Sequence, residues 1–350
     1  MATRMVLDAL YFSGVQTASR FWMGGLGGIL MLHRVADRRQ AGGFRPNAHL
    51  TVTPAFLDRV IGVLKRRGFR FVTMDGLVDE LRSYDARRWH DPLVAITLDD
   101  GYRDNLENAV PIFRRYEVPY TIYVAPGLVD GRATLWWEDL EQVIGRRERF
   151  VLHSPKGHVE FDVATPAAKR RVFDELCRFL TRDVDEDQQR KIVAELAWQA
   201  GVDPEANRAA AIMNWREIVE LASDPLCTIG AHTVHHFALA RLPDRRVDAE
   251  MVESMRILKM ELGELPRHFA YPYGYPQAAG AREFRLAREA GFVTAVTTRH
   301  GVVYPGHAAH LHALPRISLN GNFQAMRYVD TLLSGLPTRI QNRGAAMSVT

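Results

Sequence analysis

Two adjacent carboxylates are the side chains of this sequence best placed for chemistry. Residues 94–98 form an apolar, largely β-branched run that predicts a buried strand, and the chain continues directly into Asp99, Asp100 and Gly101. Neighbouring carboxylates repel each other unless a cation lies between them or one of them accepts a proton. A divalent metal ion bound by one carboxylate, with the other acting as a base, meets both conditions. A solvated Asp-Asp-Gly turn is the alternative interpretation.

A pair of histidines supplies the remaining donors that a metal site needs. His232 and His236 are four residues apart and follow another apolar run, residues 226–229. On a helical turn this spacing places both imidazoles on one face, within reach of one ion. Two histidines and one carboxylate form a common catalytic zinc site with a coordination position left for water. The sequence therefore predicts one divalent metal ion, Zn²⁺, although a surface histidine cluster is the alternative.

Three segments carry a resemblance to a known family. The sequences TLDDGY (97–102), HTVHH (232–236) and FAYPYG (269–274) resemble the motifs of the polysaccharide deacetylases, carbohydrate esterase family 4, also called the NodB homology domain. The resemblance extends over about residues 29–320. It implies a metal-dependent hydrolase that removes an N-acetyl group from an amino sugar in a glycan or glycan precursor.

The resemblance also implies a role for individual residues. Asp99 corresponds to the catalytic base, and Asp100, His232 and His236 correspond to the metal ligands. The backbone N–H of Tyr273 corresponds to the donor that stabilises the oxyanion.

The third motif departs from the family pattern at one residue. The family usually has an arginine there that pairs with the base, whereas this chain has Ala270. We predict that Arg316, which opens a later strand-like run, supplies the missing cation beside Asp99 and keeps that carboxylate ionised. A surface arginine at the start of a strand is the alternative.

The general acid is the second departure. The family usually has a histidine after an apolar strand near its C-terminus, but no run of that kind precedes a histidine after residue 274. Residues 29–32 are such a run, and they end at His33. The order resembles a circularly permuted member, in which the last barrel strand has moved to the front and His33 is the acid. The alternatives are a loop-capping role for His33, or an acid role for one of the later histidines, of which His312 is the closest candidate because it precedes Leu314; the others are His300, His307 and His310.

Strand-like and helical patterns alternate along most of the chain. This alternation predicts a distorted (β/α) barrel of seven to eight parallel strands. Each candidate catalytic or metal-binding residue before residue 275 follows a predicted strand, where barrel enzymes gather their active sites. The predicted strands cover residues 28–33, 69–73, 93–98, 120–124, 227–231, 267–271, 293–297 and 314–319.

The chain divides into a barrel and shorter flanking parts. We predict an N-terminal helix and linker over residues 1–28, a barrel over 29–335 and a flexible tail over 336–350. Residues 145–212 interrupt the alternation of strand-like and helical patterns and predict a mainly helical insertion. Its role is either purely structural or that of a lid or substrate wall.

Aromatic residues near these segments are candidates for sugar binding. Trp136, Trp137 and Tyr271 are predicted to contact substrate, because apolar sugar faces stack on aromatic rings. The tryptophan pair could equally anchor the insertion to the barrel.

Composition narrows the choice of partner and compartment. The net charge is +4 and the basic residues are scattered, which argues against a nucleic-acid partner. No clean signal peptide and no run of about 18 apolar residues is present, so we expect a cytoplasmic protein whose first helix is a candidate for peripheral contact with the inner face of the membrane. The expected partner is an acetylated amino-sugar glycan or a lipid-linked sugar. A deformylase or O-deacetylase acting on a lipid-linked sugar, and a catalytically silent glycan-binding barrel, are the alternatives.

Overall fold

Seven parallel strands close into a barrel in the computed structural model, which describes residues 2–37, 43–85, 91–154 and 157–349. The ring closes because β1 pairs with β12 on one edge and with β5 on the other. The predicted distorted (β/α) barrel is therefore confirmed. In ring order the strands are β1 (Gly27–Leu32), β5 (Leu93–Leu98), β6 (Tyr120–Val124), β9 (Cys227–Ala231), β10 (His268–Ala270), β11 (Thr294–His300) and β12 (Leu314–Ser318).

The eighth predicted strand lies outside the ring. β4 (Arg70–Phe71) pairs with the first two residues of β5, whereas β6 pairs with the last two. Two strands thus share one edge of β5, and this sharing distorts the barrel.

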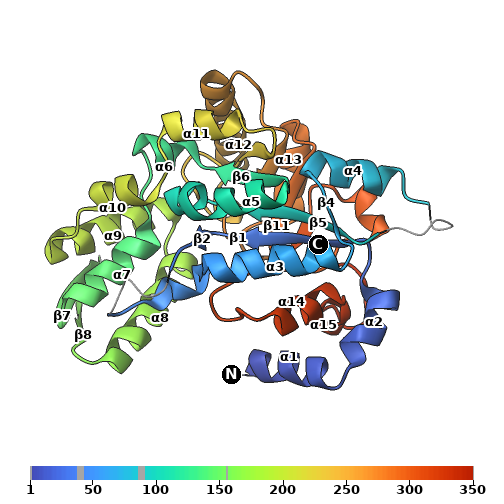
Figure 1. Ribbon diagram of the computed structural model, residues 1–350. Helices are drawn as coiled ribbons and strands as arrows, with labels where there is room; N and C mark the ends of the chain where they lie inside the picture. The colour runs from blue at the N-terminus through green and yellow to red at the C-terminus, as the bar shows by residue number, and fades with distance from the viewer. Residues whose placement is uncertain (1, 38–42, 86–90, 155–156, 350) are drawn as a thin grey trace.

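Helices cover the outside of the barrel (Figure 1). Because strand side chains point alternately inward and toward these helices, every residue of β1, β5 and β6 is buried. Helix starts follow local rules: the Thr53 hydroxyl accepts a hydrogen bond from the Phe56 N–H, and Pro54 takes the first helical position. The covering elements are α3 (Pro54–Arg66), α4 (Met74–Arg82), η3 (Asn105–Ala109), α5 (Val110–Tyr116), α11 (Trp215–Ala222), α12 (Asp244–Leu262) and α13 (Ala281–Glu289).

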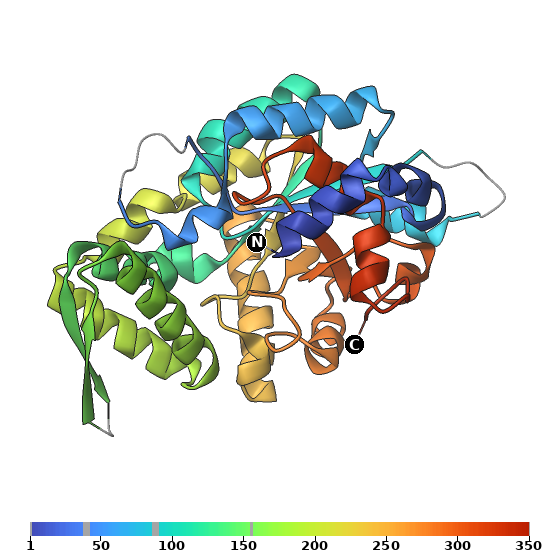
Figure 2. The ribbon, with the colours of Figure 1, turned by 90° about the horizontal axis from the view of Figure 1, so that it is seen from below.

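A mainly helical segment between β6 and β9 lies beside the barrel, with a hairpin at its outer edge (green in Figure 2). The hairpin pairs β7 (Arg149–Ser154) with β8 (Gly157–Asp162) in antiparallel register. The helices are α6 (Pro126–Asp130), α7 (Trp136–Arg146), α8 (Pro166–Arg182), α9 (Glu186–Ala200) and α10 (Pro204–Ala211).

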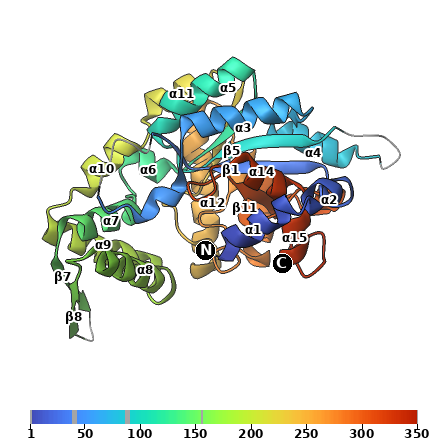
Figure 3. The ribbon, with the colours of Figure 1, turned by 60° about the horizontal axis from the view of Figure 1, so that its bottom comes forward.

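Both ends of the chain contain helices. The first residues form two helices, α1 (Ala2–Phe12) and α2 (Val15–Met23), and α15 (Leu336–Gln341) occupies part of the predicted flexible tail. α1 packs against α14 (Met326–Leu333), where Arg327 donates to Asp8 at 2.7 Å (Figure 3). This tertiary contact gives both ends a partner that local sequence does not reveal. Among the described residues, none of the helices is both long and apolar enough to cross a membrane.

Shorter elements complete the connections. They are β2 (Arg34–Val35), η2 (Pro46–Leu50), β3 (Thr51–Val52), η4 (Leu239–Arg241) and η5 (Pro305–Ala309).

Candidate active site

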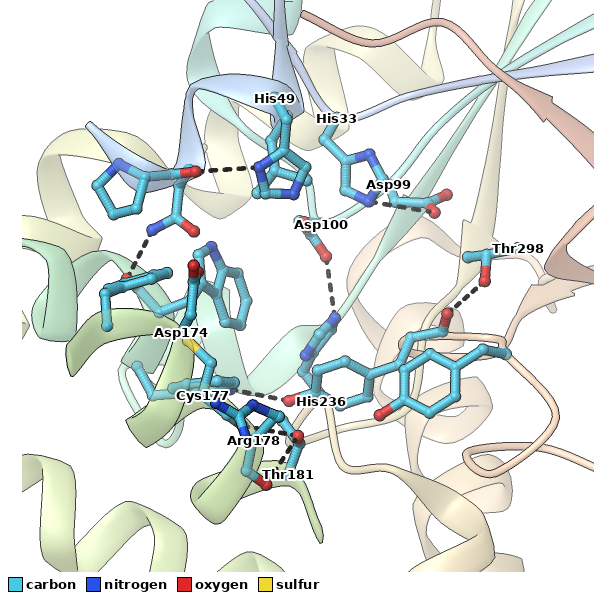
Figure 4. Close-up of a pocket in the computed structure, with 18 of the residues that line it drawn as sticks. His33, His49, Asp99, Asp100, Asp174, Cys177, Arg178, Thr181, His236 and Thr298 are labelled. Carbon is cyan, nitrogen blue, oxygen red and sulfur yellow. Dashed lines mark hydrogen bonds and ion pairs between the residues drawn. The ribbon is translucent and has the colours of Figure 1, made fainter. Parts of the chain in front are cut away.

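A pocket of about 780 Å³ opens at the C-terminal ends of the barrel strands (Figure 4). We call the four residues at its base the pocket floor: Asp99, Asp100, His232 and His236. They follow β5 and β9, so the parallel barrel brings together two motifs that are distant in sequence.

Three side chains of the pocket floor converge on one point. Oδ1 of Asp100 lies 3.4 Å from Nε2 of His232 and 3.2 Å from Nε2 of His236. All three residues are buried, and their ligand atoms lie within 4.8 Å of one another.

The hydrogen bonds around these residues fit a cation at that point. Nδ1 of His232 lies 2.7 Å from the Ala270 carbonyl oxygen, which can only accept, so Nδ1 carries the proton and Nε2 of a neutral ring presents a lone pair. Burial lowers the pKa of His236, although Asp100 opposes that shift, and this favours the neutral ring. Oδ1 of buried Asp100 has no hydrogen-bond partner within the described part of the chain, as expected for an oxygen that binds a cation. Two neutral imidazoles and a carboxylate form a donor set that suits Zn²⁺.

The backbone at the site adopts conformations that non-glycine residues rarely take. Asp100, Thr233, His236 and Tyr273 have φ values of 74°, 60°, 57° and 61°. Such strain persists only where the surrounding structure enforces it, and it is often found at functional sites. Gly274 continues the turn with a φ of 57°, and a Cβ there would lie 2.5 Å from the backbone nitrogen of Thr298.

Asp99 forms a buried, two-pronged ion pair with Arg316. The guanidinium donates to both carboxylate oxygens at 2.7 Å, and its Nε donates to the Thr297 carbonyl at 2.8 Å. Burial alone would raise the pKa of Asp99, but the Arg316 charge and hydrogen bonds bring it below its ordinary value. The structure thus places Arg316 beside the predicted base, where the sequence predicted a compensating cation.

Of the histidines proposed as acid, the structure brings only His33 to the pocket. Its Nε2 lies 3.9 Å from Oδ2 of Asp99, and about a fifth of its side chain is exposed (Figure 4). His312 lies in a separate hollow, where its Nε2 contacts the Phe292 carbonyl at 2.8 Å. His49, which sequence reasoning did not single out, also lines the pocket, and burial lowers its pKa.

Tyr273 and the two tryptophans form one side of the pocket. The indole N–H of Trp136 donates to the Tyr273 hydroxyl at 2.8 Å, and that of Trp137 donates to the Tyr102 hydroxyl at 3.1 Å. The Trp137 ring lies 5.0 Å from the His236 ring between centroids. Both tryptophans are almost fully buried, so they border the pocket and also anchor α7 to the barrel.

Tyr271 does not reach the pocket, contrary to the predicted substrate contact. Its side chain is fully buried against Phe284 of α13, and its hydroxyl donates to the His312 carbonyl at 3.0 Å. The chain alternates faces at the end of β10, and this position faces the covering helices.

Helix α8 of the segment between β6 and β9 lines another side of the pocket. Its pocket-facing residues, which we call the α8 wall, are Arg170, Phe173, Asp174, Cys177, Arg178, Thr181 and Arg182. Their spacing of three or four residues follows one face of the helix.

Several residues that hold the site were missed from the sequence. Buried Glu250 of α12 accepts hydrogen bonds from the backbone N–H groups of Val234 and His235, both at 2.9 Å, and so fixes the loop between the two metal-type histidines. Its position within an amphipathic helix gave no signal, because a glutamate there is usually solvated.

A second buried network fixes the backbone beside His33. Arg34 donates to Asp104 at 2.8 Å and to Glu138 at 2.9 Å, and the Asn105 side chain donates to the His33 carbonyl at 2.8 Å. These partners come from three separate segments, so the sequence alone could not pair them.

Comparison with known proteins gives consistent results. The profile of the polysaccharide deacetylase family matches residues 86–174 and 188–295, more than half of the chain. No curated protein sequence matches this chain.

Three solved structures with a similar fold are distant from this chain in sequence. The deacetylase PplD of Streptococcus pyogenes is 17% identical with a TM-score of 0.56, covering 87% of this chain and 97% of that one. IcaB of Ammonifex degensii is 20% identical with a TM-score of 0.54, covering 88% and 97%. A de-N-acetylase of Aggregatibacter actinomycetemcomitans is 13% identical with a TM-score of 0.55, covering 87% and 98%. At these identities the likeness shows a common fold.

Proposed function

The chain belongs to the polysaccharide deacetylase family, and we propose that it hydrolyses the N-acetyl group of an amino sugar in a glycan or glycan precursor with the help of one divalent metal ion, Zn²⁺. The observation that carries the proposal is the pairing of Asp99 with Arg316 next to the Asp100, His232 and His236 cluster. An ionised carboxylate beside a metal site is what a hydrolase needs to activate water. A barrel that only bound glycans would need no such base.

The proposed chemistry divides between the ligands and the groups around them. Asp100, His232 and His236 would hold the ion, which supplies a Lewis acid and lowers the pKa of a water molecule. Asp99 accepts the proton of that water as its oxygen attacks the acetyl carbonyl, and Arg316 keeps Asp99 ionised and oriented.

The remaining groups act on the oxyanion and on the leaving group. The Tyr273 N–H donates no hydrogen bond within the described part of the chain, so it is available to stabilise the oxyanion. His33 donates a proton to the nitrogen as the C–N bond breaks, which releases acetate and a free amino sugar.

Acetate release from chitohexaose, combined with metal analysis, tests the proposal. We expect the wild-type protein to release acetate, to lose activity with a chelator and to regain it with Zn²⁺. His232→Ala should lose both metal and activity. His310→Ala is the matched control, because His310 is exposed and lies outside the pocket. Full metal occupancy in His232→Ala would refute the ligand assignment, and absence of acetate release from the zinc-loaded wild type would refute the activity on this substrate.

A further inference from the structure

The α8 wall carries an unusual set of charges. Arg170, Arg178 and Arg182 all line the pocket from one face of α8. Arg182 lies twelve positions after Arg170 along the helix, a rise of about 18 Å. The wall is therefore a row of guanidinium groups along the pocket rather than a single cluster, and Figure 4 shows its Arg178 on the side away from His33.

The acidic groups of the pocket are already engaged elsewhere. Asp99 pairs with Arg316, Asp100 faces the two histidines, and Asp174 accepts from Arg170 at 3.0 Å. None of the ion pairs between described residues involves Arg178 or Arg182, and both side chains are exposed. The α8 wall consequently presents net positive charge to whatever occupies the pocket.

Positively charged residues also lie beyond the pocket, next to the arginines of the α8 wall. A neighbouring hollow of about 550 Å³ shares Pro46 and Arg170 with the pocket and is also lined by Lys169 and Arg45. At the other end, the charge of Arg182 acts on Tyr275, whose pKa is raised mainly by burial. A ligand in contact with all these basic residues would extend from the neighbouring hollow along the α8 wall.

We propose that the α8 wall binds a glycan chain that carries repeated anionic groups, so that the substrate of the pocket floor is an acidic amino-sugar polymer. This inference rests on the proposed function for the hydrolysis reaction, but binding of the anionic glycan to the α8 wall can be measured independently of that reaction. Lys169 lies beside the Asp174-paired Arg170, and Arg178 and Arg182 lie further along α8, so positive charge is present at two positions up to about 20 Å apart. Such a spread suits carboxylate, phosphate or sulfate groups repeated along a chain. A single phosphate could contact the Arg178 and Arg182 pair, but it could not also reach Lys169 at the other position.

Equilibrium binding of two N-acetylated hexasaccharides tests the proposal without relying on catalysis. Hyaluronan hexasaccharide carries alternating carboxylates, whereas chitohexaose is neutral. Calorimetric titration should show at least about 10-fold tighter binding of the hyaluronan probe at low salt, and the difference should shrink at high salt because ions screen exposed charges.

Single substitutions in α8 test which arginines cause the preference for hyaluronan. Arg178→Ala and Arg182→Ala should each weaken hyaluronan binding about 2- to 5-fold relative to chitohexaose, as expected for exposed charge pairs. Arg171→Ala is the matched control, because Arg171 is exposed on the same helix but does not line the pocket. Alanine keeps the helix propensity of α8, so these variants should fold normally.

Each outcome decides the proposal. Equal binding of the two probes, or an equal effect of Arg171→Ala, would overturn it. A loss concentrated in one arginine would also overturn it, in favour of a compact phosphate such as that of a lipid-linked sugar. Selective hyaluronan binding without acetate release from either probe would refute the proposed function and leave this inference intact, whereas acetate release with equal binding would do the reverse.

Discussion

The pocket floor and the α8 wall form two sides of one pocket but are built in opposite ways. Each charge of the floor is buried and has a partner from a distant segment; Asp99 and Arg316 are 217 residues apart. The wall comes from one helix, and its arginines are exposed. The floor can therefore change only at a high cost in stability or chemistry, whereas the wall can alter recognition without disturbing the reacting groups.

The largest expected effect comes from removing the base of the pocket floor. Asp99→Asn should lower kcat on chitohexaose about 10³-fold, because the amide cannot accept the proton. Metal content should stay the same, since Asp100, His232 and His236 remain. Elemental analysis and circular dichroism check that the site and fold persist. Near-normal turnover would show that Asp99 is only a neighbour of the reaction.

Loss of Arg316, the ion-pair partner of Asp99 in the floor, and loss of an arginine of the wall should have clearly different effects on stability. Arg316→Ala leaves Asp99 buried without its cation and should lower the free energy of unfolding by about 3–5 kcal/mol. Arg178→Ala, on the exposed wall, should change it by less than about 0.5 kcal/mol. Urea denaturation at pH 7 measures both, and equal losses would contradict the comparison.

The Asp99–Arg316 ion pair predicts that the stability and the activity of the protein depend on pH. Because Arg316 lowers the folded-state pKa of Asp99, its stabilisation is present above the unfolded value of 3.8 and is lost as pH falls through the lower folded value. The stability gap between wild type and Arg316→Ala should therefore narrow in strong acid. In the variant the pKa of Asp99 rises, so the acidic limb of the pH–rate profile should move to higher pH.

Removing His33 tests which histidine of the pocket acts as the general acid. His33→Ala should lower turnover of an N-acetyl amide about 10²-fold, but affect an activated acetyl ester much less, because a good leaving group needs no proton. His49→Ala is the control from the same pocket. A selective loss in His49→Ala instead would transfer the role to His49.

The smallest predicted effect concerns a buried charge in α7. Asp139 accepts a hydrogen bond from the Asn207 side chain at 2.9 Å, but its other carboxylate oxygen has no hydrogen-bond partner among the described residues. Burial raises the pKa of Asp139 to about 6. Because the folded-state pKa is raised, wild-type stability should fall as pH rises from about 4 to about 6. Asp139→Asn should remove that fall and add about 2 kcal/mol at pH 7. Thermal unfolding at pH 4 and pH 7 checks this, and no gain at pH 7 would contradict it.

Local sequence determined much of the barrel and of the pocket floor. Apolar runs of strand length located all eight strands of the main sheet, including β4, and the motifs at 97–102 and 232–236 lie at the ends of two of them. Because parallel strands end at the same rim, residues that follow different strands must meet there. The absence of arginine at Ala270 also predicted a replacement, and Arg316 lies where one is needed. Whether the strand order reflects a circular permutation stays a prediction.

Other features were decided only by tertiary packing. Nothing in the sequence indicated that Tyr271 faces the covering helices or that Glu250 fixes the histidine loop. The sequence left open whether the 145–212 insertion borders the substrate, and the structure places one face of its α8 at the pocket. The helices at the two chain ends likewise pack against each other across the whole length of the sequence. Periodicity shows that a strand or helix has a buried face, but the neighbour that covers this face comes from a distant part of the chain. That choice depends on how the whole barrel and its inserted helices pack together.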